Sequence, residues 1–253
     1  MKTAQTSVAA TSTFSASVEV GRDAWCTIWI AELRGLFVNM SSERAAVQAV
    51  PAAITGHLQW LERHGELPHP PTRFTLSVTE RHRARGGMRW GDYEVLHEFE
   101  RPPVTPEEVG RALRWMGCMR LDTVRLIESL PRTALDWSRP GQERSIRENL
   151  YHLARGERWY LQRLNLKPLP TIGGARNPLR RLAHVRGHVG WRLLHLAPEE
   201  CARIIQTDGR WWSARKMLGR FLYHERYHLR SIARIVRYHR APVPAGLGGW
   251  PRY

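Results

Sequence analysis

Short runs in which apolar and polar residues alternate occupy much of the first hundred positions, a pattern typical of half-buried β-strands. Between the third and fourth runs, Ser41 or Ser42 can cap a helix that continues to residue 64 and stops at Gly65. The order βββαββ predicts an α+β domain over residues 14–100. The predicted strands lie at 14–20, 24–30, 36–40, 73–80 and 93–99.

Beyond residue 105 the apolar spacing changes to the 3.6-residue period of amphipathic helices. Thr105 can cap the first helix, with Pro106 at its first position and Glu108 completing a capping box. We expect no strands between the helices. The pattern predicts an all-α four-helix bundle over residues 101–241. The predicted helices cover 106–130, 144–164, 178–196 and 212–240.

Composition limits the location of the protein. Among its 253 residues there is no run of 18 apolar positions, so we expect no membrane contact, and the first 13 residues lack the apolar core of a secretory signal. The three cysteines form no C-x-x-C pair, which fits a reducing cytoplasm. Residues 1–13 and 242–253 are predicted to be tails, the first of them disordered.

Charge is distributed unevenly along the chain, whose net charge is +16. Residues 1–100 carry 10 Lys and Arg against 11 Asp and Glu, whereas residues 101–253 carry 29 against 12. Such a basic half is compatible with an anionic partner or with a solvated arginine-rich surface. Because no nucleic-acid recognition motif accompanies it, we favour the solvated surface and expect a small-molecule substrate rather than nucleic acid.

The sequence HERYH begins at His224, and its spelling H-E-x-x-H is that of zinc proteases. A protease would take a third ligand from position 234, which is Arg234, or from a later Glu, yet Glu225 is the last acidic residue. We therefore reject the protease interpretation. Residues four apart share one face of a helix, so His224 and His228 either hydrogen-bond within the core or share a metal ion.

A third ligand must come from an earlier helix. His152 borders the apolar stripe of the second helix, and the third helix offers His184 and His188 at the same four-residue spacing as the first pair. Spacing alone does not separate these alternatives. Glu225 is a weak candidate for orienting a ligand or moving a proton, but it lies about 100° around the helix from His224, which also fits a surface salt bridge.

Two segments, LDWSRPGQERSIRENLYHLARGERWYLQRL and WSARKMLGRFLYHERYHLRSIARI, resemble the DinB/YfiT superfamily of four-helix metalloproteins. In that family a His from the second helix and H-x-x-x-H from the last form a three-histidine site. The resemblance implies that His152, His224 and His228 bind a divalent metal (Zn, Ni, Mn or Co). It also implies a thiol-dependent S-transferase or isomerase that uses a low-molecular-weight thiol.

The first domain carries a second resemblance. AELRGLFVNMSSERAAVQAVPAAITGHLQWLERHGE is similar to the HicB-type fold, whose members are often antitoxins. The resemblance implies a structural or regulatory module, and we expect a homodimer. The alternative to an enzyme is a non-catalytic interaction protein in which this module binds a partner.

Overall fold

The computed structural model describes residues 12–89, 95–138, 144–167 and 177–239, and the chain divides into two compact units between residues 93 and 94. The sequence predicted this boundary after residue 100, seven residues closer to the C-terminus than the division in the structure. Residues 1–11 and 242–253, most of the two predicted tails, lie outside the described part. Among the described helices, none combines the length and the apolar character needed to span a bilayer.

The first unit is a four-stranded sheet with one helix, in the element order βββαβ. The strand order is β3-β2-β1-β4, in which β1 is antiparallel to β2 and parallel to β4. Helix α1 packs on β2 and β3, and every residue of β2 is buried. The elements are β1 (Ser12–Val20), β2 (Cys26–Ile30), β3 (Phe37–Met40), α1 (Glu43–Arg63) and β4 (Phe74–Arg83).

Local signals at the ends of α1 act as predicted. The hydroxyl of Ser42 accepts a hydrogen bond from the backbone N–H of Ala45 at 3.2 Å, so Ser42, not Ser41, is the N-cap. Gly65 follows the helix with φ of 70°, a left-handed conformation that glycine adopts without a steric penalty. Pro51 lies within the helix without ending it.

The predicted fifth strand is wrong over its described part. Residues 95–97 form no regular structure, and Glu98–Glu100 is a 3-10 helix, η1; residues 93 and 94 are not described. The segment belongs to the second unit, and two of its backbone carbonyls accept hydrogen bonds from side chains there instead of pairing in a sheet. The ammonium of Lys216 donates to the Val95 carbonyl at 2.7 Å, and the Ser213 hydroxyl donates to the Glu100 carbonyl at 2.6 Å. Those bonds hold it against the start of α6.

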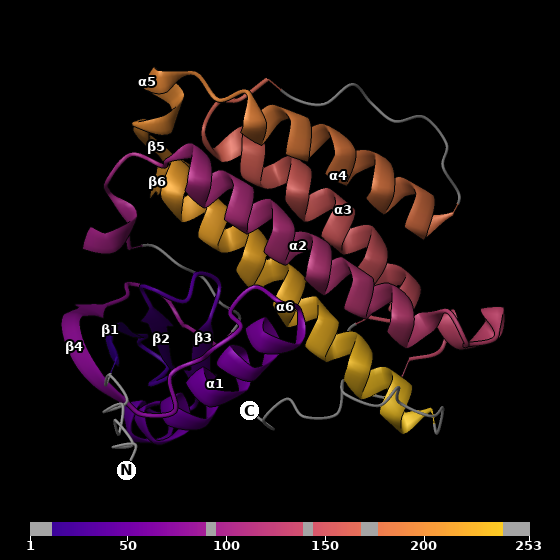
Figure 1. Cartoon of the computed structure of the whole chain (residues 1–253), viewed down its shortest axis with the longest axis horizontal. Helices are drawn as coiled ribbons and strands as arrows, with labels where there is room; N and C mark the ends of the chain where they lie inside the picture. Colours follow the sequence, from indigo (N-terminus) through magenta and orange to yellow (C-terminus); the bar gives the residue numbers. More distant parts are fainter. Residues whose placement is uncertain (1–11, 90–94, 139–143, 168–176, 240–253) are drawn as a thin grey trace, which may run out of the picture. The chain divides into compact units, whose positions relative to one another are not determined.

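The second unit contains the predicted four-helix bundle (Figure 1). Helix α6 packs against α2 and α3, and α4 packs against the same two helices. In the bundle α2 therefore lies diagonally opposite α3, and α4 lies diagonally opposite α6. Thr105 and Glu108 form the predicted capping box. The helices are α2 (Pro106–Ile127), α3 (Ile146–Arg163), α4 (Pro178–Leu194), the short α5 (Pro198–Cys201) and α6 (Ala214–Tyr238), with a 3-10 turn, η2 (Arg132–Leu135), after α2.

An antiparallel hairpin precedes the last helix, where we expected no strands. It consists of β5 (Ile204–Thr207) and β6 (Arg210–Ser213). Asp208 and Gly209 connect them with φ of 50° and 73°, the left-handed pair of a type I′ turn. The Asp-Gly dipeptide between apolar runs is the signal that sequence reasoning overlooked.

Candidate metal centre

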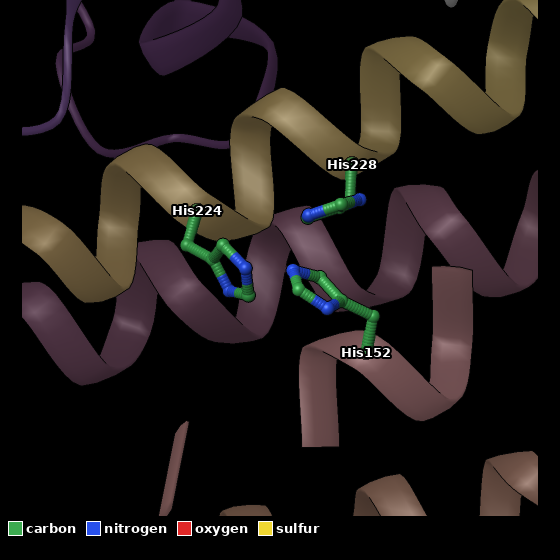
Figure 2. Close-up of side chains that lie close together, drawn as sticks. All are labelled: His152, His224 and His228. Atoms are coloured by element: carbon green, nitrogen blue, oxygen red, sulfur yellow. The ribbon is translucent and has the colours of Figure 1, made fainter. Parts of the chain in front are cut away.

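Three imidazoles from two helices converge in the bundle. His224 and His228 lie one turn apart on α6, and His152 extends toward them from α3 (Figure 2). The ring centroids of His224 and His228 are 4.6 Å apart, and that of His152 is 5.0 and 4.7 Å from them, respectively. One ring nitrogen from each residue lies within 4.8 Å of the other two. The predicted trio is therefore brought together.

The three rings suit a divalent metal both in chemistry and in spacing. Tetrahedral coordination at a metal–nitrogen distance of about 2.1 Å places ligand nitrogens about 3.4 Å apart. Nitrogens within 4.8 Å of one another can reach that separation through small side-chain rotations. Imidazole is a good ligand for Zn, Ni and Co, and three protein ligands leave at least one coordination position open.

Hydrogen bonding leaves most of the ring nitrogens available. Nδ1 of His228 lies 2.7 Å from Oδ1 of Asn149, a buried residue on α3. Within the described part of the chain, this is the one hydrogen bond between a protein group and the three rings. Several close imidazoles with so few partners are better explained by a shared ligand than by ordinary core packing.

Burial keeps the three imidazoles neutral. It lowers the pKa of His152 to about 4, with smaller contributions from Arg144 and Arg155. Burial followed by the charge of His152 lowers the pKa of His224 to about 3. The pKa of His228 falls well below its usual value because of burial and its two histidine neighbours. Neutral rings present lone pairs at neutral pH, as metal ligation requires.

Gly156 makes room for one of the rings. It lies on α3 one turn after His152, where a Cβ would approach Cε1 of His224 to 2.3 Å and Nδ1 to 2.8 Å. Contacts this short are far inside van der Waals distance. Any larger residue at this position would displace the His224 imidazole.

Residues 119–232 match a family model described as the DinB superfamily. This segment is a DinB-superfamily domain. Among solved structures, the chain is similar to YfiT from Bacillus subtilis, described as a probable metal-dependent hydrolase with an unusual four-helix bundle topology. The identity is 16%, the TM-score is 0.46, and the match covers 60% of this chain and 97% of YfiT. No curated protein matches the chain.

Other histidines of the DinB domain lie away from the trio. In α4 the buried face is formed by Leu182, Val185 and Val189, whereas His184 is exposed and His188 is partly exposed. Neither of these alternatives joins the three-histidine group among the described residues.

Glu225 occupies a buried ion-pair network instead of the metal centre. Of the two alternatives for Glu225, the surface salt bridge is wrong, since the residue is only 1% exposed. Its carboxylate accepts hydrogen bonds from Arg120 at 2.8 and 3.0 Å and from Arg186 at 2.7 Å. Burial alone would raise the pKa of Glu225, but the two guanidinium groups outweigh burial and hold it low. Glu225 is thus an anion committed to two arginines.

Glu157 completes this network, which we call the charge quartet: Arg120, Glu157, Arg186 and Glu225. Arg120 donates to Glu157 at 2.9 Å, and Arg186 donates to it at 2.7 and 3.1 Å. Each long helix of the domain contributes one member, so the quartet ties α2, α3, α4 and α6 together. No local sequence pattern reveals ion pairing among residues on four separate helices.

Proposed function

We propose that the DinB domain binds one divalent metal ion through His152, His224 and His228, and that the protein is a metal-dependent enzyme. The observation that carries the proposal is the convergence of three neutral imidazoles from two helices on one point. Three nitrogen ligands with an open position are typical of catalytic sites, whereas structural sites are closed by four protein ligands.

The chain's own residues define what the site can do. His152 is partly exposed, so solvent can reach this ligand, whereas His228 is only 2% exposed. A divalent ion in this position would lower the pKa of a bound water or thiol and stabilise the anion that forms. The charge quartet fixes the four helices around the site and thereby restrains the two that supply the ligands.

We further propose thiol-dependent S-transferase or isomerase chemistry, with a low-molecular-weight thiol as co-substrate. Support for this part comes from the family resemblance of the segments around His152 and His224. Glu225 has no part in the proposed chemistry, because its carboxylate is already bound by two arginines.

Metal analysis of the purified protein tests the proposal. Wild-type protein should contain close to one Zn, Ni, Mn or Co per chain by plasma mass spectrometry. His224→Ala should lose it, whereas the matched control His184→Ala, on the exposed face of α4, should retain it. Wild-type protein that folds normally and binds none of these ions would contradict the proposal. It would favour the alternative function, an interaction protein whose HicB-like module binds a partner.

A further inference from the structure

Asn149 has a fixed amide orientation. Its Nδ2 lies 2.8 Å from the carbonyl oxygen of Ser145. A carbonyl only accepts hydrogen bonds, so the NH₂ group, and not Oδ1, must face it. A flipped amide would place two acceptor oxygens at that distance inside the protein, where repulsion is poorly screened.

The backbone that anchors this amide is itself held in place. Ser145 is the N-cap of α3, and its hydroxyl accepts from the backbone N–H of Glu148 at 3.2 Å. The Glu148 carboxylate in turn accepts from the backbone N–H of Ser145 at 2.7 Å. This capping box fixes the first turn of the helix. The orientation of Asn149 is therefore set by the helix terminus on which it sits.

The fixed amide determines which nitrogen of His228 carries the proton. With the NH₂ group facing Ser145, Oδ1 faces Nδ1 of His228 at 2.7 Å and can only accept. A neutral imidazole has one N–H and one lone pair, so Nδ1 must carry the hydrogen and Nε2 must carry the lone pair. In the opposite tautomer Nε2 would carry the hydrogen and would have no lone pair to offer a metal.

We propose that Asn149 is a positioning residue that holds His228 as the Nδ1–H tautomer and so presents Nε2 to the divalent ion. Its role toward the ion rests on the proposed function, whereas its control of the tautomer is independent of metal. A partner of this kind fixes both the tautomer and the ring orientation of a ligand. Loss of such partners typically lowers metal affinity about 10- to 100-fold.

The first test uses metal-free wild-type protein. Two-bond ¹H–¹⁵N correlation spectra distinguish protonated from unprotonated ring nitrogens, and His228 is assigned by comparison with His228→Gln. We expect a single Nδ1–H tautomer at neutral pH. In Asn149→Leu the spectrum should change to a mixture of tautomers or to the Nε2–H form. An Nε2–H form in the wild-type protein would overturn the proposal.

Metal affinity gives the second test, measured by Co²⁺ titration of the visible absorption and by Zn²⁺ competition. Asn149→Leu should bind about 10- to 100-fold more weakly. Asn149→Asp places a carboxylate oxygen opposite the Ser145 carbonyl, so it should lower stability, but it keeps an acceptor for Nδ1–H and should bind within tenfold of wild type. The control is Asn177→Ala, which removes the N-cap of α4 and should lower stability without changing affinity.

The outcomes separate the two proposals. If wild-type protein binds no ion but the tautomer still depends on Asn149, the positioning role stands and the metal function fails. If Asn149→Leu binds Co²⁺ as tightly as wild type, or if affinity falls equally in Asn149→Asp and Asn149→Leu, the positioning role is contradicted. In the latter case the bond to Ser145, and hence simple helix stability, would explain the loss.

Discussion

Neutralising Glu225 tests whether the charge quartet is structural. In Glu225→Gln the side chain keeps its shape, but an amide NH₂ replaces one of the two oxygens that accept guanidinium hydrogen bonds at 2.7–3.0 Å. Arg120 and Arg186, whose side chains are 14% and 16% exposed, then share only the carboxylate of Glu157. The bundle interior would carry an uncompensated positive charge.

The expected cost follows from this geometry. Removing one partner of a buried ion pair costs about 3–5 kcal/mol. We expect about 3 kcal/mol, the lower end, because Glu157 remains and the two arginines keep some contact with water. In a chain of this size that loss corresponds to a fall in Tm of about 6–12 °C. The three histidines are unchanged, so metal affinity under native conditions should stay within a few-fold of wild type.

Hydrogen exchange in urea, followed by mass spectrometry, is the appropriate assay because it reports α1 and α6 separately. The free energy of unfolding should fall in α6 and not in α1. Glu98→Gln is the matched control: it makes the same substitution in an exposed pair with Arg101, which is worth about 0–1 kcal/mol. A cost for Glu225→Gln no larger than that of the control would refute the structural role. If Glu225→Gln keeps its fold but loses the metal, Glu225 has a role in the metal site.

Three further predictions concern the metal centre. Gly156→Ala should weaken Co²⁺ binding at least tenfold by displacing His224, although alanine is about 1 kcal/mol more favourable than glycine within a helix. Gly187→Ala on α4 is the control, since among the described residues its Cβ would meet no atom beyond its own helix turn within 4 Å; it should bind normally and be slightly more stable. His188→Ala should leave the metal content unchanged, and a loss would show that α4 supplies a ligand. Finally, the metal-free bundle should lose stability as pH falls from about 6.5 toward 4. The pKa values of His152 and His224 are lowered to about 4 and 3 in the folded protein, so in this range the unfolded chain binds protons that the folded protein does not. The urea midpoint of unfolding should fall less steeply with decreasing pH in His224→Gln than in the wild-type protein. An equal fall in both would contradict the lowered pKa of His224.

Patterns carried by neighbouring residues could be predicted from the sequence. Spacings of three or four positions determine the helix caps at Ser42 and Thr105. The same kind of spacing places His224 and His228 one helical turn apart. The Asp208-Gly209 turn belongs to the same class and was overlooked. The strand expected near residue 95 failed for a different reason: the Val95 carbonyl accepts a hydrogen bond from Lys216, which lies far along the chain.

Features that depend on distant contacts could not be predicted from one sequence. Helical spacing placed Glu225 correctly at about 100° from His224, but spacing does not reveal whether that face meets solvent or another helix. Here it meets arginines of α2 and α4. The bond between Asn149 and His228 likewise joins residues 79 positions apart. His152 was selected by resemblance, because spacing left His184 and His188 as equal alternatives.

The central claim is that three histidines of the DinB domain hold one metal ion, and anomalous diffraction tests it most directly. Crystals grown with the metal that copurifies, or with Co²⁺ or Zn²⁺, would be measured on both sides of the corresponding absorption edge. The account predicts a single strong anomalous peak about 2.1 Å from one nitrogen each of His152, His224 and His228, with Nε2 as the His228 ligand. A peak elsewhere in the chain, or none between these three rings, would contradict it.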